Sequence, residues 1–239
     1  MARHRHVSAA AEPNIPAGDA KPPRRTTAAA TATVALLVII LTAWLAGARG
    51  AEQSQTGLVR WFNHPPQPLA AVFGAVNPLL RPIPLTIVGV LLIIWVVLAA
   101  RRASERWELV RAAMVTLVLA ELMAQLAKYV ASQPRPLAVV PGLDSHGYPI
   151  QPHGNAYPSA HTAVVVALVA GLWPWTRWPQ RVVGVATATL VAFNRLYIGA
   201  HWPIDIVGGA AIGMLAASIT WLLARRWPIH RQSAPNASR

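Results

Sequence analysis

The sequence predicts an all-α fold, a polytopic membrane helix bundle with about six transmembrane helices. Three observations predict it. Hydrophobic residues make up 54% of the 239-residue chain and charged residues only 12%, a balance foreign to ordinary soluble domains. Six stretches approach the roughly 20 apolar residues that a spanning helix needs. Lys and Arg fall between these stretches instead of gathering in one patch.

The predicted spans follow one another along the chain. They cover residues 28–47, 83–100, 109–131, 160–175, 182–198 and 204–224. The fourth and fifth are short and carry polar residues at their ends, so their boundaries are the least defined. On the last span, Gly209, Gly213 and Ala217 recur every four residues, a spacing that lets helices approach closely.

Residues 28–226 are predicted to form one domain, because no soluble domain fits between the spans. Residues 1–27 hold five basic residues and almost no large apolar side chain, which predicts a disordered basic tail. The apolar run that follows exceeds a usual signal core and predicts an uncleaved anchor. Residues 227–239 are predicted to form a second tail.

Basic residues predict the orientation in the cell membrane. With the N-terminus inside, fifteen Lys and Arg residues fall in inside segments and six outside. Because cytoplasmic loops carry the excess, both termini are predicted to be cytoplasmic. The formal charge of +13 does not indicate nucleic acid, since the basic residues punctuate apolar runs. Cysteine is absent, which excludes disulfides and thiolate chemistry.

Three separated segments carry residues suited to chemistry: Lys128–Pro136, Tyr157–Thr162 and Asn194–Asp205. The alternation of spans brings all three to the outer, extracytoplasmic face. Together they hold three cations, two histidines, a serine and an aspartate: Lys128, Arg135, Arg195, His161, His201, Ser159 and Asp205.

The three cations predict an anion between them. Charges in a partly desolvated pocket attract strongly, and unpaired charges in a membrane are costly. Arg135 and Arg195 present planar forks that suit phosphate oxygens. The Ser159 hydroxyl and the N–H groups that open the fourth span add donors. A phosphoryl group fits this set.

The two histidines supply what phosphate cleavage requires. His201 and Asp205 are four residues apart, and Pro203 suits the first turn of a helix, so the carboxylate can reach back to the imidazole. Such a pair fixes the tautomer and leaves the other ring nitrogen as nucleophile or base. His161 can then protonate the departing oxygen.

These segments resemble the three-part signature of the type 2 phosphatidic acid phosphatase family. That signature is Lys, six residues and Arg-Pro, then Pro-Ser-Gly-His, then Arg, five residues, His, three residues and Asp. The chain departs at Ala160, where the family has Gly, and at Asn194, where it usually has Ser. The match covers residues 128–205, about a third of the chain.

The resemblance implies a metal-independent lipid phosphatase that needs no cofactor. It implies that His201 forms a phosphohistidine, that Asp205 orients His201 and that His161 protonates the leaving group. The phosphoryl oxygens would be held by Lys128, Arg135, Ser159 and Arg195.

The expected partners are a lipid phosphate substrate and membrane lipids, because a site at the membrane surface meets a head group while the tails stay in lipid. Polyprenyl diphosphate, phosphatidate and phosphatidylglycerol phosphate remain open, with an isoprenoid diphosphate favoured by family analogy alone. No nucleic-acid partner is expected, and the sequence leaves the oligomeric state open.

Two other functions remain as alternatives. A vanadium haloperoxidase would use a related pocket, although six spans argue against it. A transporter or lipid-binding protein would need the cations but not a nucleophile and an acid together. Taken singly, the residues also have structural readings: the cations could snorkel to water, Ser159 could only cap a helix, and His201 with Asp205 could be a structural pair.

Three further features lie around the predicted site. Glu121, Gln125 and Lys128 share one helix face, which predicts a polar ladder beside the pocket, with interhelical packing as the alternative. Residues 136–158 are expected to form a loop over the site that helps to choose the substrate. Three histidines in outer loops follow no zinc pattern and are expected in solvent: His64, His146 and His153.

Overall fold

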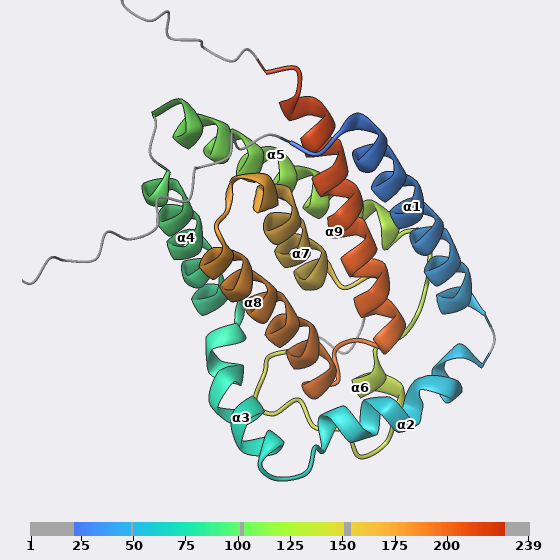
Figure 1. Cartoon of the computed structure of the whole chain (residues 1–239). Coiled ribbons are helices and arrows are strands. Elements are labelled where there is room, and N and C mark those ends of the chain that lie inside the picture. Colours follow the sequence, from blue (N-terminus) through green and yellow to red (C-terminus); the bar gives the residue numbers. More distant parts are fainter. Residues whose placement is uncertain (1–21, 49, 101–102, 151–153, 228–239) are drawn as a thin grey trace, which may run out of the picture.

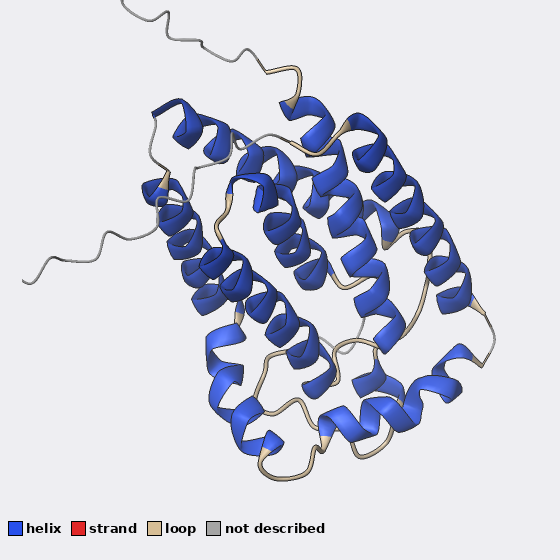
Figure 2. Ribbon diagram, in the orientation of Figure 1, coloured by secondary structure: helices blue, strands red, loops and turns tan. Residues whose placement is uncertain are grey.

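The computed structural model describes residues 22–48, 50–100, 103–150 and 154–227, and every regular element in these ranges is a helix (Figure 2). The predicted all-α class is confirmed. The long helices are α1 (Arg25–Gly47), α4 (Pro82–Ala99), α5 (Ala103–Ala127), α7 (Ala160–Leu172), α8 (Trp178–Tyr197) and α9 (Pro203–Ala224). The short elements are α2 (Ala51–Asn63), α3 (Leu69–Val76), η1 (Asn77–Leu80), α6 (Pro136–Val139) and η2 (Trp173–Trp175).

The long helices form a bundle, and the short helices α2, α3 and α6 gather at one end of it (Figure 1). We call this the site end. The start of α1 and the finish of α9 lie at the opposite end (Figure 1). There, Arg225 Nη1 donates to the carbonyls of Pro22 and Pro23, at 3.2 and 2.8 Å. The predicted tails at 1–21 and 228–239 lie outside the described residues.

Helix α9 packs against α1, α5 and α7 through small residues. A Cβ added at Gly209 would lie 2.4 Å from the Ser159 carbonyl oxygen, and one at Gly213 would lie 2.6 Å from that of Ala163. Only glycine therefore permits this approach of the two backbones. The small-residue spacing of the last span thus serves helix packing, as the sequence predicts.

Side-chain hydrogen bonds join the helices inside the bundle. Thr116 Oγ1 donates to Thr220 Oγ1 at 2.8 Å, which links α5 to α9. The Tyr157 hydroxyl lies 2.9 Å from Thr42 Oγ1 and donates to the Ile39 carbonyl at 3.1 Å. These bonds satisfy polar groups that lipid could not satisfy, and the second set fixes the segment before α7 against α1.

Large apolar side chains cover the outside of the bundle. Leu37 on α1, Leu91 on α4 and Val118 on α5 are 61%, 58% and 59% exposed. An apolar exterior of this extent suits lipid and not water. Among the described residues, three helical segments are long and apolar enough to cross a membrane: Arg25–Gly47, Arg106–Ala127 and Pro203–Ala224. The chain is a membrane protein, and the count of six spans stays a prediction.

Each predicted span corresponds to a long helix, and the helix ends differ from the predicted ends by a few residues. The third was expected over 109–131, but α5 ends at Ala127, and the next three residues continue in tight turns, with Lys128 N bonded to the Gln125 carbonyl at 3.2 Å. The connection between the first two spans holds α2, α3 and η1, which the sequence analysis did not predict.

Candidate active site

Hydrogen bonds tie the three predicted segments to one another at the site end. Ala156 N donates to the Gln133 carbonyl at 2.7 Å, and Ser159 N donates to the Asp205 carbonyl at 3.1 Å. The indole of Trp202, which is fully buried, donates to the Pro134 carbonyl at 2.8 Å. Segments that are distant in sequence are therefore joined directly to one another.

The predicted pair of His201 and Asp205 is present. Asp205 lies in the first turn of α9, after Pro203, and its Oδ2 accepts from Trp202 N at 2.7 Å. The same oxygen lies 3.4 Å from His201 Nδ1, without hydrogen-bond alignment. His201 is 5% exposed and Asp205 is 0% exposed. The carboxylate therefore stands behind the imidazole on its Nδ1 side.

Burial sets the charge of His201. Desolvation, then Arg135 and Arg195, lowers the pKa of His201 well below its ordinary value of 6.5, and a hydrogen bond with the backbone of Ala156 opposes this shift. A histidine with such a pKa is neutral at physiological pH. Its ring nitrogen therefore carries the lone pair that a nucleophile needs.

His161 lies in the first turn of α7, within electrostatic range of Arg195, His201, Lys128 and Arg135. It shares a cavity with His201. Ser159 is 0% exposed, its hydroxyl accepts from Thr162 at 3.0 Å, and it is not among the residues that line the cavity, so its predicted contact with a phosphoryl oxygen stays a prediction. Ser159 occupies the N-cap position of α7 without a side-chain capping bond.

Lys128 and Arg135 approach the site from the end of α5 and from the N-cap of α6. Desolvation lowers the pKa of Lys128, Arg135 lowers it further, and Glu121 raises it. Arg135 Nη1 lies 3.4 Å from the Ala200 carbonyl, and its buried Nε has no hydrogen-bond partner among the described residues. These are cations held partly out of water, where an anion is strongly attracted.

The Arg195 guanidinium makes several hydrogen bonds within the protein. It is 2% exposed, and its Nη2 donates to the Leu80 carbonyl at 3.1 Å and to Asn194 Oδ1. The Asn194 amide in turn donates to Asn77 Oδ1 at 2.9 Å. The departure from Ser at position 194 therefore has a structural consequence, because asparagine bridges Arg195 to η1.

Tyr148 is a site residue that sequence reasoning missed. It comes from the expected loop at 136–158, is 7% exposed and lines the same cavity as His161 and His201. Arg195 Nη1 donates to its hydroxyl at 2.9 Å, and the guanidinium carbon lies 4.6 Å from the ring centroid. No periodicity or motif spacing indicates this contact, which joins residues 47 positions apart.

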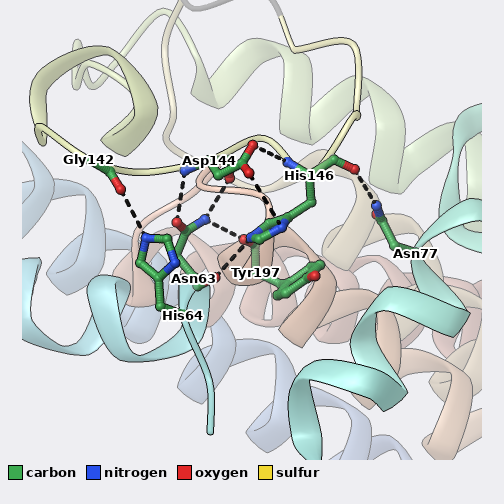
Figure 3. A network of polar contacts seen from close by, with 7 residues as sticks. All are labelled: Asn63, His64, Asn77, Gly142, Asp144, His146 and Tyr197. Atoms are coloured by element: carbon green, nitrogen blue, oxygen red, sulfur yellow. Dashed lines mark hydrogen bonds and ion pairs between the residues drawn. The ribbon is translucent and has the colours of Figure 1, made fainter. Parts of the chain in front are cut away.

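The loop that carries Tyr148 is anchored by a polar network (Figure 3). His146 was expected in solvent, but its ring stacks on that of Tyr197 with centroids 3.9 Å apart, and its Nε2 lies 2.9 Å from the Asn63 carbonyl. This expectation was wrong, because α2 supplies a partner that the sequence analysis did not foresee. His64 is exposed and contacts the Gly142 carbonyl at 2.9 Å, and His153 lies outside the described residues.

The site opens into a cavity of about 710 Å³ between α4, α5, α7 and α8. One end is polar and includes Lys128, Arg135, Arg195 and the two histidines. The wall beyond is largely apolar, with residues such as Val90, Leu117, Val164 and Leu168. Cavities of this size hold small molecules or parts of larger ones. The cavity thus combines an anion-binding end with a largely apolar remainder.

Glu121 and Gln125 line the cavity beside Lys128. Gln125 Nε2 donates to Glu121 Oε1 at 2.6 Å, and Glu121 acts electrostatically on Lys128. Two members of the predicted polar ladder are therefore hydrogen-bonded to each other, and the third is within electrostatic range. Among the described residues, no three His, Asp or Glu side chains are grouped as metal ligands.

Comparison with known families identifies this arrangement. Residues 109–228 match the PAP2 superfamily. The chain belongs to the PAP2 superfamily. The matched region begins in α5 and runs to the end of the described chain, so it contains every residue of the predicted site.

Relatives of this PAP2 chain include two curated enzymes. An undecaprenyl-diphosphatase of Sulfolobus acidocaldarius is 28% identical over 49% of this chain and 56% of its own length. Phosphatidylglycerophosphatase B of Escherichia coli is 39% identical over 30% of each chain. The chain thus spans about half the length of the first relative and less of the second.

A solved PAP2 structure shares the fold. The crystal structure of a transmembrane PAP2-type phosphatidylglycerolphosphate phosphatase from Bacillus subtilis superimposes with a TM-score of 0.63 and 14% identity. The similarity covers 84% of this chain and 99% of that one. At this identity it establishes the fold.

Proposed function

We propose that this PAP2 protein is an integral membrane phosphatase that hydrolyses a lipid phosphate or diphosphate through a phosphohistidine on His201. One observation carries the proposal: two histidines and three cations line one end of a cavity whose other walls are largely apolar. An anionic head group suits the first part and a lipid chain suits the second. The phosphatase names of the relatives support the same chemistry.

The first step is transfer of the phosphoryl group to His201. Because Asp205 stands on the Nδ1 side, Nε2 is the nucleophile. Its lone pair forms a bond to phosphorus while the bond from phosphorus to the lipid oxygen breaks. His161 enters this step as an imidazolium, which the negative charge of the bound phosphate stabilises, and it gives its proton to that oxygen. Asp205 stabilises the positive charge that develops on the His201 ring.

The second step is hydrolysis of the phosphohistidine. A water molecule gives a proton to His161, and its oxygen attacks phosphorus as the bond to Nε2 breaks. Inorganic phosphate leaves, and both histidines return to their starting states. Lys128, Arg135 and Arg195 balance the charge on the phosphoryl oxygens in both steps. Ser159, which lies outside the cavity wall, acts by holding the start of α7.

The substrate belongs to the lipids with a terminal phosphate or diphosphate. Polyprenyl diphosphate, phosphatidate and phosphatidylglycerol phosphate all meet this description. The relatives named above act on the first and third kinds by their names. We place the site on the extracytoplasmic side, with both termini cytoplasmic, from the distribution of Lys and Arg.

Phosphate release tests the reaction. The protein is purified in detergent with a chelator and supplied with each of the three lipids, beside His201→Ala and beside His4→Ala as a control for expression and extraction. We expect release from at least one lipid, its loss in His201→Ala and its retention in His4→Ala. No release from any lipid by folded protein would overturn the proposal and favour a binding or transport role.

Cysteine labelling tests the orientation. The natural chain has no cysteine, so a single introduced thiol reports its own position. Tyr129, which is 89% exposed, lies next to the site end of α5, and the exposed Arg226 follows α9 at the opposite end. We expect a membrane-impermeant reagent to label Tyr129→Cys in intact cells, and Arg226→Cys only after permeabilisation. The reverse pattern would place the site in the cytoplasm.

A further inference from the structure

Tyr148 brings a hydroxyl group into the active site. It lines the cavity together with His161, His201 and Arg195, yet it belongs to the loop between α6 and α7 and to none of the three predicted segments. The Tyr148 side chain is fixed there by Arg195, both through the hydroxyl at 2.9 Å and through the ring face at 4.6 Å. Because buried polar groups are normally hydrogen-bonded, both the oxygen and the proton of this hydroxyl should have partners.

A tyrosine hydroxyl can accept hydrogen bonds and can donate one. Towards Arg195 it must accept, because a guanidinium only donates. Its bond to Arg195 is its single hydrogen bond among the described residues, so its own proton remains available to a ligand. A phosphoryl oxygen accepts strongly, and a donor already bonded to a cation is polarised.

We propose that Tyr148 donates a hydrogen bond to a phosphoryl oxygen of the bound lipid phosphate and is thus an additional phosphate-binding residue. The inference rests on the proposed function and adds to it a ligand from the outer loop. Tyr148 and Arg195 act as one unit, in which the cation attracts the phosphoryl group and the hydroxyl orients one of its oxygens.

The loop is built to hold this hydroxyl in place. Asn63, at the end of α2, donates through Nδ2 to the carbonyls of Asp144, at 2.7 Å, and Tyr197, and its Oδ1 accepts from Asp144 N at 2.9 Å. Asn77 donates to the His146 carbonyl at 3.0 Å. Figure 3 shows the bonds from Asn63 and Asn77 reaching Asp144 and His146, with Tyr197 of α8 bonded to Asn63 beside them. A loop ordered in advance spares the entropy cost of ordering it when ligand binds.

Contacts within the protein also reduce the number of N–H groups that Arg195 can donate to a ligand. A guanidinium has five N–H groups. Arg195 donates one to Tyr148 and one each to the Leu80 carbonyl and Asn194 Oδ1. Its buried Nε has no partner among the described residues. Three of the five N–H groups are therefore engaged within the protein, and the Tyr148 hydroxyl adds a donor beside the two that remain for a phosphoryl oxygen.

Binding of orthovanadate, an analogue of phosphate in its reacting geometry, tests the proposal without requiring turnover. Its dissociation constant is obtained from the rise in melting temperature with vanadate concentration. Tyr148→Phe keeps the ring over Arg195 and removes the hydroxyl. We expect the dissociation constant to rise about 10- to 100-fold, the effect of one hydrogen bond to a charged group. An unchanged constant in a folded variant would overturn the proposal.

Tyr197→Phe is the matched control. Tyr197 packs against the same loop through its ring, which phenylalanine retains, and it does not line the cavity. We expect its vanadate constant to stay within about twofold of the parent protein, since only general loss of loop order would change it. A rise in Tyr197→Phe equal to that in Tyr148→Phe would overturn the proposal.

Fluorination separates donation to the ligand from simple support of Arg195. 3-Fluorotyrosine at position 148 is a stronger donor and a weaker acceptor than tyrosine. We expect tighter vanadate binding at a pH that keeps the phenol protonated. Weaker or unchanged binding would overturn the proposal and leave Tyr148 as a positioning residue for Arg195. Failure of the proposed function would appear differently, as absence of phosphate release by the parent protein.

Discussion

Replacing Gly209 with alanine tests the close approach of α9 to α7, on which the geometry of the site depends. The added Cβ would lie 2.4 Å from the Ser159 carbonyl oxygen, whereas real Cβ contacts essentially never fall below 3.0 Å. The clashing atom is backbone and cannot rotate away. The start of α7 must therefore move by at least about 0.6 Å, the difference between these distances.

The magnitude follows from this displacement. Overpacking of this kind costs about 1–3 kcal/mol, and about 2–4 °C of melting temperature are lost per kcal/mol in chains of this size. We therefore expect the melting temperature of Gly209→Ala to fall by roughly 2–12 °C. Because His161 follows Ser159 by two residues, it moves with the start of α7, and a misplacement near 1 Å can lower the rate by about 100-fold.

Two further alanine variants serve as comparisons. Gly213→Ala places its Cβ 2.6 Å from the Ala163 carbonyl oxygen, one turn further from the site, and should lose similar stability with less loss of activity. Gly74→Ala on α3 meets nothing within 4 Å and should be neutral or stabilising, as alanine favours helix.

Thermal unfolding in detergent and kcat/KM for phosphate release are the two measurements. If Gly209→Ala unfolds at the same temperature as Gly74→Ala, α9 does not approach α7 as the structure has it. If Gly209→Ala loses stability but no more activity than Gly213→Ala, the start of α7 does not set the catalytic geometry.

Three other predictions follow from individual contacts. Glu121 raises the pKa of Lys128, so in Glu121→Gln the alkaline limb of the kcat/KM profile should move to lower pH, since the ammonium loses its proton more readily; an unmoved limb would exclude this coupling. In His161→Ala, kcat/KM should fall about 100- to 10,000-fold with an alkyl lipid phosphate. It should fall far less with p-nitrophenyl phosphate, whose leaving group needs no proton; equal losses would argue against the role of His161 as an acid. Asn194→Ser should lower stability by about 1–3 kcal/mol in a thermal unfolding assay, because a serine hydroxyl is too short to reach both Asn77 and Arg195; unchanged stability would show that this bridge contributes nothing.

Glu108→Gln is the control for the pH profile. Glu108 lies on the same helix as Glu121 and accepts from the Trp175 indole at 3.4 Å, at the end of α5 remote from Lys128. We expect its alkaline limb to coincide with that of the parent protein. A shift equal to that of Glu121→Gln would indicate a general effect of charge and not a local one.

The sequence alone was sufficient for the helix class and for the place where the chemistry gathers. Apolar runs of spanning length are local properties, and helices of that length alternate in direction, so the site-bearing segments had to meet at one end of the bundle. The pairing of His201 with Asp205 was also predictable from local sequence, because a spacing of four residues at the start of a helix brings the two side chains together.

Helix ends and connections were less accessible to sequence reasoning. Lys128 was placed within the third span, but the chain leaves the helix at Ala127 and turns towards Asn155, whose amide donates to the Lys128 carbonyl at 2.6 Å. This tertiary partner has no trace in the hydropathy of α5. For the same reason α2 and α3 were missed, as neither is a long apolar run.

Only the tertiary structure decided how the site is lined. Ser159 fits the family motif yet faces Thr162, while Tyr148 fits no motif and lines the cavity. Periodicity reports which face of a helix is apolar, and motif spacing reports which residues share a turn. Neither reports contacts between a loop and a distant helix end, because such contacts depend on how whole elements pack. The chain therefore specifies its phosphate chemistry locally, while its outer loop and the partners of Arg195 are set by the fold.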